Sequence, residues 1–411
     1  MSLAAGSKLV RLLVCCALLA VPSLLMAQAG SLDPTFGSSG IAATPGTTAA
    51  AAALQRDGKI VVAGGASNGS TVLRYNTNGT LDSTFGTGGQ VILSASSAFA
   101  VAIQSDGKIL VAAPDEFGSE FVLAIFRLNT NGSLDTSFGS KGVATITATT
   151  QFFAPANGTI ALLAGGKILV VAQSASLGAE VFERLLSNGT PDSSFGTNGT
   201  AALVNAGQML ALQPGGEILV LAGLFPQGGA VSRYETNGSV DASFGGAGQA
   251  AGFGNGGAMA VIDSSSEFVV AGSLVTPPLS LQGNTTGFLL VRYKSNGNID
   301  TTFGTNGVTT TPFPGNLFSA AAAVALQSNG DTVAGGSTAA APNNPKNSDF
   351  ALARYTASGT LDTTFGTNGL VTTTIGTDGS AINTLLIQSD GKILAFGNSS
   401  AGATIARYLS E

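Results

Sequence analysis

Carboxylates are the side chains of this sequence that could do chemistry. The acids that no repeated pattern explains are Asp115, Glu116, Glu120, Glu180, Glu183 and Asp349. Asp115, Glu116 and Glu120 cluster in one expected loop, and Asp349 lies near another. Paired carboxylates can hydrolyse glycosidic bonds or hold Ca²⁺. No pair recurs with a diagnostic ligand spacing, so a solvated loop is the alternative interpretation of these acids.

The chain has no histidine, which removes the commonest general base and metal ligand. Ser-His-Asp and Cys-His catalysis are excluded, and so are the usual zinc sites. Both cysteines, Cys15 and Cys16, lie in an N-terminal apolar segment. We therefore predict no metal, no cofactor and no catalytic residue, and the acids named above stay as loop candidates.

The charge balance argues against two classes of partner. Only 10% of the 411 residues are charged and the net charge is −6, whereas an average protein has about 25% charged residues. No run of Lys and Arg is present, so we expect neither nucleic acid nor an anionic lipid surface as a partner. We expect a monomer.

The N-terminus has the pattern of a secretory signal peptide. Lys8 and Arg11 precede an apolar stretch from Leu12 to Met26, and Ala27-Gln28-Ala29 matches a cleavage site after Ala29. An uncleaved anchor is the alternative, but the stretch is short for a span of about 20 residues. We predict a signal peptide at residues 1–29, a single domain at 30–411, and a secreted protein, extracellular or periplasmic, with no membrane insertion after cleavage.

A motif of eight residues, Asp-x-(Ser/Thr)-Phe-Gly-x-x-Gly, occurs seven times. Its aspartates are Asp33, Asp82, Asp135, Asp192, Asp241, Asp300 and Asp362, spaced 49 to 62 residues apart. Between two copies the sequence reads as short strands joined by tight turns, for instance Lys108–Ala113 and Phe121–Leu128. Such a recurrence predicts an all-β fold: a seven-bladed β-propeller with four antiparallel strands, A to D, in each blade.

An arginine precedes each of the last six motif aspartates by eight residues. These arginines are Arg74, Arg127, Arg184, Arg233, Arg292 and Arg354, and Arg407 ends the equivalent strand near the C-terminus. Across a tight hairpin this offset can place the two side chains on neighbouring strands, so we predict a repeated, bidentate Arg–Asp ion pair. Carboxylate binding by the arginines is the functional alternative. We expect the motif phenylalanines to pack between blades.

Two members of this set lack a partner along the chain. Asp33 has no arginine before it, and Arg407 has no aspartate after it. If they pair with each other, the N-terminal strand completes the last blade and closes the ring. Residues 31–44 then supply strand D of that blade, and residues 381–409 supply strands A, B and C. We expect the closed ring to leave no free sheet edge.

The residues of the repeat resemble a known family. The runs at 132–143 (GSLDTSFGSKGV) and 104–111 (QSDGKILV) are similar to the delta-60 repeat family of bacterial β-propellers. The resemblance covers residues 31–411 and extends more distantly to NHL-type propellers. It implies the propeller fold, and it carries no activity and no site residue over to this chain.

Length variation between the repeats points to one face of the ring. The A–B and C–D turns are short and uniform, whereas the B–C and D–A connections vary, and variable loops on a rigid scaffold usually carry specificity. The sequence favours a secreted, non-catalytic propeller that binds a glycan or protein on that face. The alternatives are a secreted carbohydrate-active enzyme that uses loop carboxylates, and a purely structural surface component. The aromatic candidates for binding are Phe225, Phe253, Phe313 and Phe318.

Overall fold

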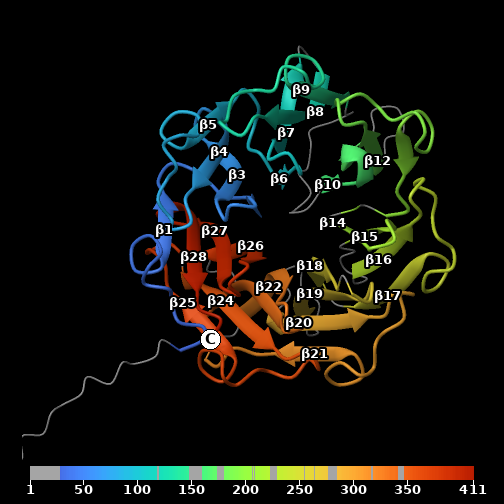
Figure 1. Cartoon of the computed structure of the whole chain (residues 1–411). Helices are drawn as coiled ribbons and strands as arrows, with labels where there is room; N and C mark the ends of the chain where they lie inside the picture. Colours follow the sequence, from blue (N-terminus) through green and yellow to red (C-terminus); the bar gives the residue numbers. More distant parts are fainter. Residues whose placement is uncertain are drawn as a thin grey trace, which may run out of the picture.

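The strands form a ring of seven four-stranded antiparallel units around a central axis (Figure 1). The computed structural model describes residues 28–117, 120–147, 160–173, 180–205, 207, 209–222, 229–253, 255–262, 264–275, 285–315, 318–340 and 347–411. The seven-bladed β-propeller predicted from the sequence is confirmed, with strand A innermost and strand D outermost in every blade.

The first four blades follow the chain in order. Blade one consists of β2 (Ala51–Leu54), β3 (Ile60–Ala66), β4 (Gly69–Tyr75) and β5 (Gln90–Leu93). Blade two consists of β6 (Ala100–Ile103), β7 (Ile109–Phe117), β8 (Glu120–Leu128) and β9 (Val143–Thr147). Blade three consists of β10 (Ile160–Leu162), a 3₁₀ turn η1 (Ala164–Gly166), β11 (Ile168–Gln173), β12 (Glu180–Leu185) and β13 (Thr200–Ala202). Blade four consists of β14 (Met209–Leu212), β15 (Ile218–Ala222), β16 (Gly229–Tyr234) and β17 (Gln249–Phe253).

The last three blades have a longer strand A than the first four, and the seventh is shared between the chain ends. Blade five consists of β18 (Asn255–Val261), β19 (Phe268–Val275), β20 (Thr285–Tyr293) and β21 (Val308–Thr311). Blade six consists of β22 (Phe318–Leu326), β23 (Thr332–Ala339), β24 (Ser348–Tyr355) and β25 (Leu370–Thr373). Blade seven consists of β26 (Ala381–Ile387), β27 (Ile393–Ser399), β28 (Gly402–Tyr408) and β1 (Ile41–Thr44).

Ring closure occurs through the predicted pair of chain ends. Strand β1 lies antiparallel to β28, with Ile41 opposite Ala406, and Nε of Arg407 lies 3.0 Å from Oδ2 of Asp33. The expectation that closure removes every free sheet edge is wrong. In six blades strand A pairs only with strand B, so its other edge faces the axis; in blade six, β22 also makes a parallel pairing with β20 at Ser319 and Thr286.

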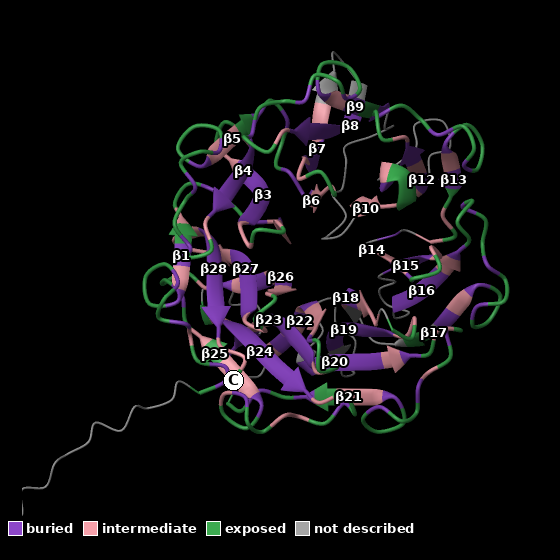
Figure 2. Ribbon diagram, viewed as in Figure 1, coloured by how far each residue is buried: buried purple, intermediate pink, exposed green. Residues whose placement is uncertain are grey.

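The hydrophobic core lies between blades rather than inside them. Seven clusters of buried side chains are found in the described residues, and each combines two adjacent blades. Phe85 of blade one, for example, packs with Ile109 and Phe126 of blade two. Strands B and C have neighbours on both faces and are buried along most of their length (Figure 2). A single blade therefore has no core of its own, and stability depends on the ring.

The motif residues form one repeated cluster, which we call the Arg–Asp–Phe cluster. In blade two, Nε of Arg127 lies 2.8 Å from Oδ2 of Asp135, and its guanidinium carbon lies 4.5 Å from the centre of the Phe138 ring. Its Nη1 donates to the backbone carbonyl of Ser187 in blade three. The cluster thus combines an ion pair, a cation–π contact and a hydrogen bond to the next blade.

All seven blades repeat this arrangement. The carbonyls that accept from the seven arginines belong, in chain order of the arginines, to Thr130, Ser187, Thr236, Ser295, Ala357, Ser410 and Thr77. Each carbonyl lies in the C–D hairpin of the following blade. The arginines therefore link the blades in a closed circuit around the ring.

The predicted bidentate geometry is wrong. The arginine contacts one aspartate oxygen, Oδ2. The other oxygen, Oδ1, accepts hydrogen bonds from the residue two positions later: in blade two these come from the backbone N–H and the hydroxyl of Ser137, at 3.1 and 2.7 Å. The Ser/Thr of the motif occupies that oxygen, and so a fork-to-fork contact cannot form.

A lysine in the A–B turn is a further partner that the sequence interpretation missed. Nζ of Lys108 lies 2.9 Å from Oδ2 of Asp135. Lys59, Lys167 and Lys392 make the same contact in blades one, three and seven. The signal was present, because these lysines follow a turn glycine. Blades four to six carry Glu217, Glu267 and Asp331 at this position.

These contacts control the ionisation of the motif aspartates. Hydrogen bonds from Ser137 lower the pKa of Asp135, and Lys108 and Arg127 lower it further, against the opposing effect of burial. The pKa is lowered for the other six motif aspartates as well. The charged form of each carboxylate is therefore the one that the folded ring holds.

Replacing Arg407 by Ala should destabilise the ring by about 3–5 kcal/mol, because it leaves the buried carboxylate of Asp33 without its main partner. Urea unfolding of the purified protein measures this. Arg56→Ala is the matched control, since Arg56 is exposed in an A–B turn and should change little. An Arg407→Ala midpoint equal to that of the parent would contradict the role given to this ion pair.

The free energy of unfolding should fall as the pH drops below about 4. Unfolded aspartates titrate near 3.9, whereas the motif aspartates of the folded ring have a lowered pKa. As the pH falls, the unfolded chain therefore takes up protons first. The stability that the aspartates contribute is lost as the pH falls from the unfolded pKa through the folded pKa. Urea titrations at a series of pH values test this. Asp135→Asn should show a shallower fall than Asp57→Asn, which removes an exposed aspartate; equal slopes would refute the assignment.

Candidate functional site

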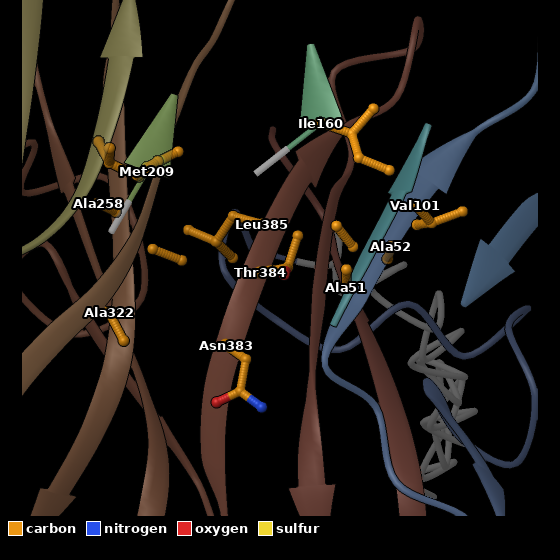
Figure 3. A pocket seen from close by; sticks show the side chains of 13 residues that line it. Ala51, Ala52, Val101, Ile160, Met209, Ala258, Ala322, Asn383, Thr384 and Leu385 are labelled. Carbon is orange, nitrogen blue, oxygen red and sulfur yellow. The ribbon is translucent and has the colours of Figure 1, made fainter. Parts of the chain in front are cut away.

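The innermost strands enclose a cavity on the ring axis (Figure 3). Strand A of every blade contributes to its wall. The lining residues are Ala51, Ala52, Ala100, Val101, Ile160, Met209, Ala258, Ala322, Ala323, Val324, Asn383, Thr384 and Leu385. The volume is about 140 Å³, close to that of an apolar cavity known to hold a benzene ring.

The lining residues place this cavity inside the ring. The D–A connections enter the strands A on the face that also carries the B–C connections; we call it the loop face. The opposite face carries the A–B and C–D turns and is called the turn face. In β2, β6, β10 and β14 the lining residues are the first residues of the strand, whereas in the longer β18, β22 and β26 they lie within the strand. The cavity is therefore surrounded by strands A along the axis, between the two faces.

Two kinds of group form the cavity wall. The side chains are apolar apart from Asn383 and Thr384, and six of the thirteen are Ala. The free edge of each strand A adds backbone N–H and C=O groups that point toward the axis. Such a wall can surround an apolar group and donate or accept hydrogen bonds beside it.

The amide of Asn383 is held in place by blade one. Its Nδ2 donates to the carbonyl of Ala49 at 3.0 Å, and Nδ2 of Asn398 donates to the same oxygen at 2.9 Å. Oδ1 of Asn398 accepts from Ala49 N–H at 2.8 Å. These bonds fix the seam between blades seven and one beside the cavity. No carboxylate is among the described residues that line the cavity.

The acids predicted to cluster in one loop lie in strands instead. Asp115 and Glu116 belong to β7, opposite Val122 and Phe121, and Glu120 begins β8. The hairpin of blade two extends farther than its sequence indicated, and the loop prediction is wrong.

The other candidate acids lie in other blades. Asp349 is in β24 of blade six, opposite Thr338. In blade three, Oε1 of Glu183 accepts from Thr200 Oγ1 at 2.7 Å, and Oε2 of Glu180 accepts from the backbone N–H of Gly207. Burial raises the pKa of both glutamates. Within the described residues, no three Asp, Glu, Cys or His side chains come together as a metal site would require.

The two aromatic candidates whose side chains the structure describes do not line the cavity. Phe313 is buried in the core between blades five and six, and Phe318 is half-buried in β22. Phe225 lies outside the described residues, and so does the side chain of Phe253 in β17. Neither of the placed phenylalanines is among the residues that line the cavity.

Larger but shallower grooves lie between blades on the turn face. One of about 830 Å³ is lined by Arg127 together with Gln104, Asp106 and Asn188. The guanidinium of Arg127 is already engaged, with Asp135, with the Ser187 carbonyl and with the Ser137 hydroxyl at 3.2 Å. The same holds for the equivalent arginines, so the structure does not support the alternative that they bind an external carboxylate.

The part of the chain that the structure describes contains no helix with the length and hydropathy that crossing a bilayer requires.

Five segments of the chain match the family described as a "Domain of unknown function (DUF5122) beta-propeller", at residues 55–85, 104–138, 213–244, 279–303 and 327–365. Four of them begin at an A–B turn, and all five end at or next to a motif phenylalanine, so they enclose the Arg–Asp–Phe cluster. The resemblance to a repeat family of β-propellers is thereby confirmed. A search of curated proteins found no match.

Solved propellers share the fold at low sequence identity. A streptogramin B lyase is 13% identical with a TM-score of 0.51, covering 89% of this chain and 94% of its own. The virginiamycin B lyase of Staphylococcus aureus is 12% identical with a TM-score of 0.52, covering 90% and 98%. Drosophila Semaphorin 1b, extracellular domains 1-2, is 9% identical with a TM-score of 0.50, covering 93% and 88%. These likenesses concern the fold alone.

Glu180→Gln should stabilise the protein at pH 7 and have little effect near pH 4. Burial raises the pKa of Glu180, so its contribution to stability is present at low pH and is lost as the pH rises through the folded pKa. The amide is neutral at every pH and can still accept from Gly207. Thermal unfolding at both pH values measures the effect, with the exposed Glu235→Gln as control. A loss of stability at pH 7 would contradict this assignment.

Proposed function

We propose that this protein is a secreted, non-catalytic binding propeller that recognises an uncharged, apolar segment of a partner protein, which enters the axial cavity from the loop face. The observation that carries the proposal is the cavity wall. It combines mostly apolar side chains from all seven blades with the backbone groups of the strand A edges. An apolar side chain of a ligand would fill the cavity, and the adjoining backbone would find hydrogen-bond partners along the edges.

A protein ligand fits the surface chemistry better than a glycan. Sugar rings usually stack on exposed Trp or Tyr, since these side chains combine an apolar face with a polar group. The chain has no Trp and only five Tyr. All five are buried, namely Tyr75, Tyr234, Tyr293, Tyr355 and Tyr408. The cavity wall has only Asn383 and Thr384 as polar side chains to bind hydroxyl groups.

The distribution of carboxylates argues against the enzyme alternative. The candidate acids lie in strands of blades two, three and six, and none lines the cavity. The sequence adds support for four connections: residues 148–159, 174–179, 223–228 and 276–284 contain no charged residue. A glycosidase needs two carboxylates on either side of the scissile bond, and these loop segments supply none.

Secretion is part of the proposal and rests on the sequence. The positively charged start, the apolar stretch and the small residues at 27 and 29 form a signal-peptide pattern. The rest of the chain has no cysteine, so an oxidising compartment would neither form nor break a disulfide in the ring.

Panning a phage-displayed random peptide library against the immobilised protein tests the function. We expect the selected peptides to share an apolar anchor residue. They should bind an Ala52→Leu/Ala322→Leu variant at least tenfold more weakly, because the added side chains fill the cavity. Ala357→Leu makes the same change at an exposed position of the turn face and should bind like the parent.

Two results would contradict the proposal. Peptides that bind the filled variant as well as they bind the parent would place recognition away from the cavity. Release of soluble products from a polysaccharide panel by the parent protein would instead favour the carbohydrate-active alternative. A thermal melt of each variant shows whether the ring is intact, so a loss of binding can be assigned to the cavity.

A further inference from the structure

The C–D hairpin of blade seven is built from the two ends of the described chain. In blade two the hairpin is continuous, with Asn129 N–H donating to the Ser133 carbonyl at 2.8 Å and Gly132 N–H donating to the Asn129 carbonyl at 2.9 Å. In blade seven, Leu409 N–H donates to the Ser31 carbonyl at 2.9 Å, and Gly30 N–H donates to the Leu409 carbonyl at 2.8 Å. Ala29, Gly30 and Ser31 therefore take the places of the last three hairpin residues, 131–133.

Ala29 supplies a contact that every other blade boundary also has. At each boundary the first glycine of the motif donates its N–H to a hairpin carbonyl of the next blade. The acceptors are Asn78, Asn131, Asn188, Asn237, Asn296 and Ser358, at 2.7–3.1 Å, and the seventh is Ala29, which accepts from Gly366 at 2.8 Å. The side chain of Ala29 is buried in the core between blades six and seven.

Gln28 also takes part in the closure. Its carbonyl accepts from Ser31 N–H at 2.9 Å, and its side-chain Nε2 donates to the Gly366 carbonyl at 2.6 Å. Both backbone groups of Gly366 are thus bound by the residue pair 28–29. A cut after Ala29 would remove these two residues. It would leave the Gly366 N–H without its acceptor. It would also place the new ammonium of Gly30 at the boundary between blades six and seven.

We propose that the leader is removed by hydrolysis of the Ala27–Gln28 bond, two residues before the site that the Ala-x-Ala pattern indicates. Water adds to the carbonyl carbon of Ala27 and the Ala27–Gln28 C–N bond breaks. Ala27 then ends the released leader with a carboxylate, and Gln28 becomes the new N-terminus with an ammonium group. Ala27 provides the small residue directly before the cut, while Leu25 stands where the Ala-x-Ala pattern has its other small residue. The inference rests on the proposed secretion and not on the proposed ligand.

The experiment is N-terminal sequencing, with intact mass measurement, of the protein exported from the full-length gene in a bacterial host. Gln28 as the first residue is the expected result. A chain that begins at Gly30 would overturn the inference, and so would an exported chain that keeps its leader. The readout does not involve ligand binding, so it is independent of the outcome of the peptide selection.

Ala29→Asn separates the two cleavage sites. Asn is the hairpin residue at this position in five other blades, among them Asn131 and Asn188, so the hairpin backbone accepts it; these asparagines are exposed whereas Ala29 is buried, and a thermal melt of the exported variant measures what the larger side chain costs. A cut after position 29 needs a small residue there and should be blocked by Asn, whereas a cut before Gln28 should proceed. Accumulation of unprocessed Ala29→Asn, with a parent that begins at Gly30, would refute the inference.

Discussion

The structure depends on the guanidinium of each strand-C arginine. One side chain binds the carboxylate of its own blade, stacks on the phenylalanine of its own blade, and donates to a carbonyl of the next blade. Burying an isolated charge is costly, and a buried ion pair is tolerated only when its hydrogen bonds are also satisfied. The motif repeats this arrangement seven times: Ser/Thr and hairpin groups surround each pair, and a lysine joins it in four blades.

This arrangement separates architecture from function across the ring. The Arg–Asp–Phe clusters and the lysines that join them lie at the turn face, where the hairpins are short and uniform. The axis is lined instead by small apolar side chains and strand edges. The wedge shape of the blades requires this, since strands that converge on an axis leave little room for side chains. A cavity with mostly apolar walls and backbone groups along the strand edges is the consequence.

Sequence reasoning about the site succeeded for pairs that are close along the chain and failed for contacts across it. The eight-residue offset between Arg127 and Asp135 is a local hairpin property, so the pair could be predicted. The Ser187 carbonyl lies 60 residues away, and nothing in the spacing indicates it. The sequence interpretation placed Asp115 and Glu116 in a loop, because a polar segment near a hairpin is typical of a loop. In the structure, pairing between β7 and β8 extends through this segment.

The sequence by itself determined the number of blades, the strand order within a blade, the Arg–Asp pairs and the pairing of Asp33 with Arg407 that closes the ring. These follow from a repeated motif and from local turn chemistry, which act over a few residues. Only the tertiary structure decided which aspartate oxygen each arginine binds, where the candidate acids lie, the cavity on the axis, and the place of Gln28 and Ala29 in the last hairpin. Each of these features depends on residues from different blades, and their distances are set by the packing of the closed ring.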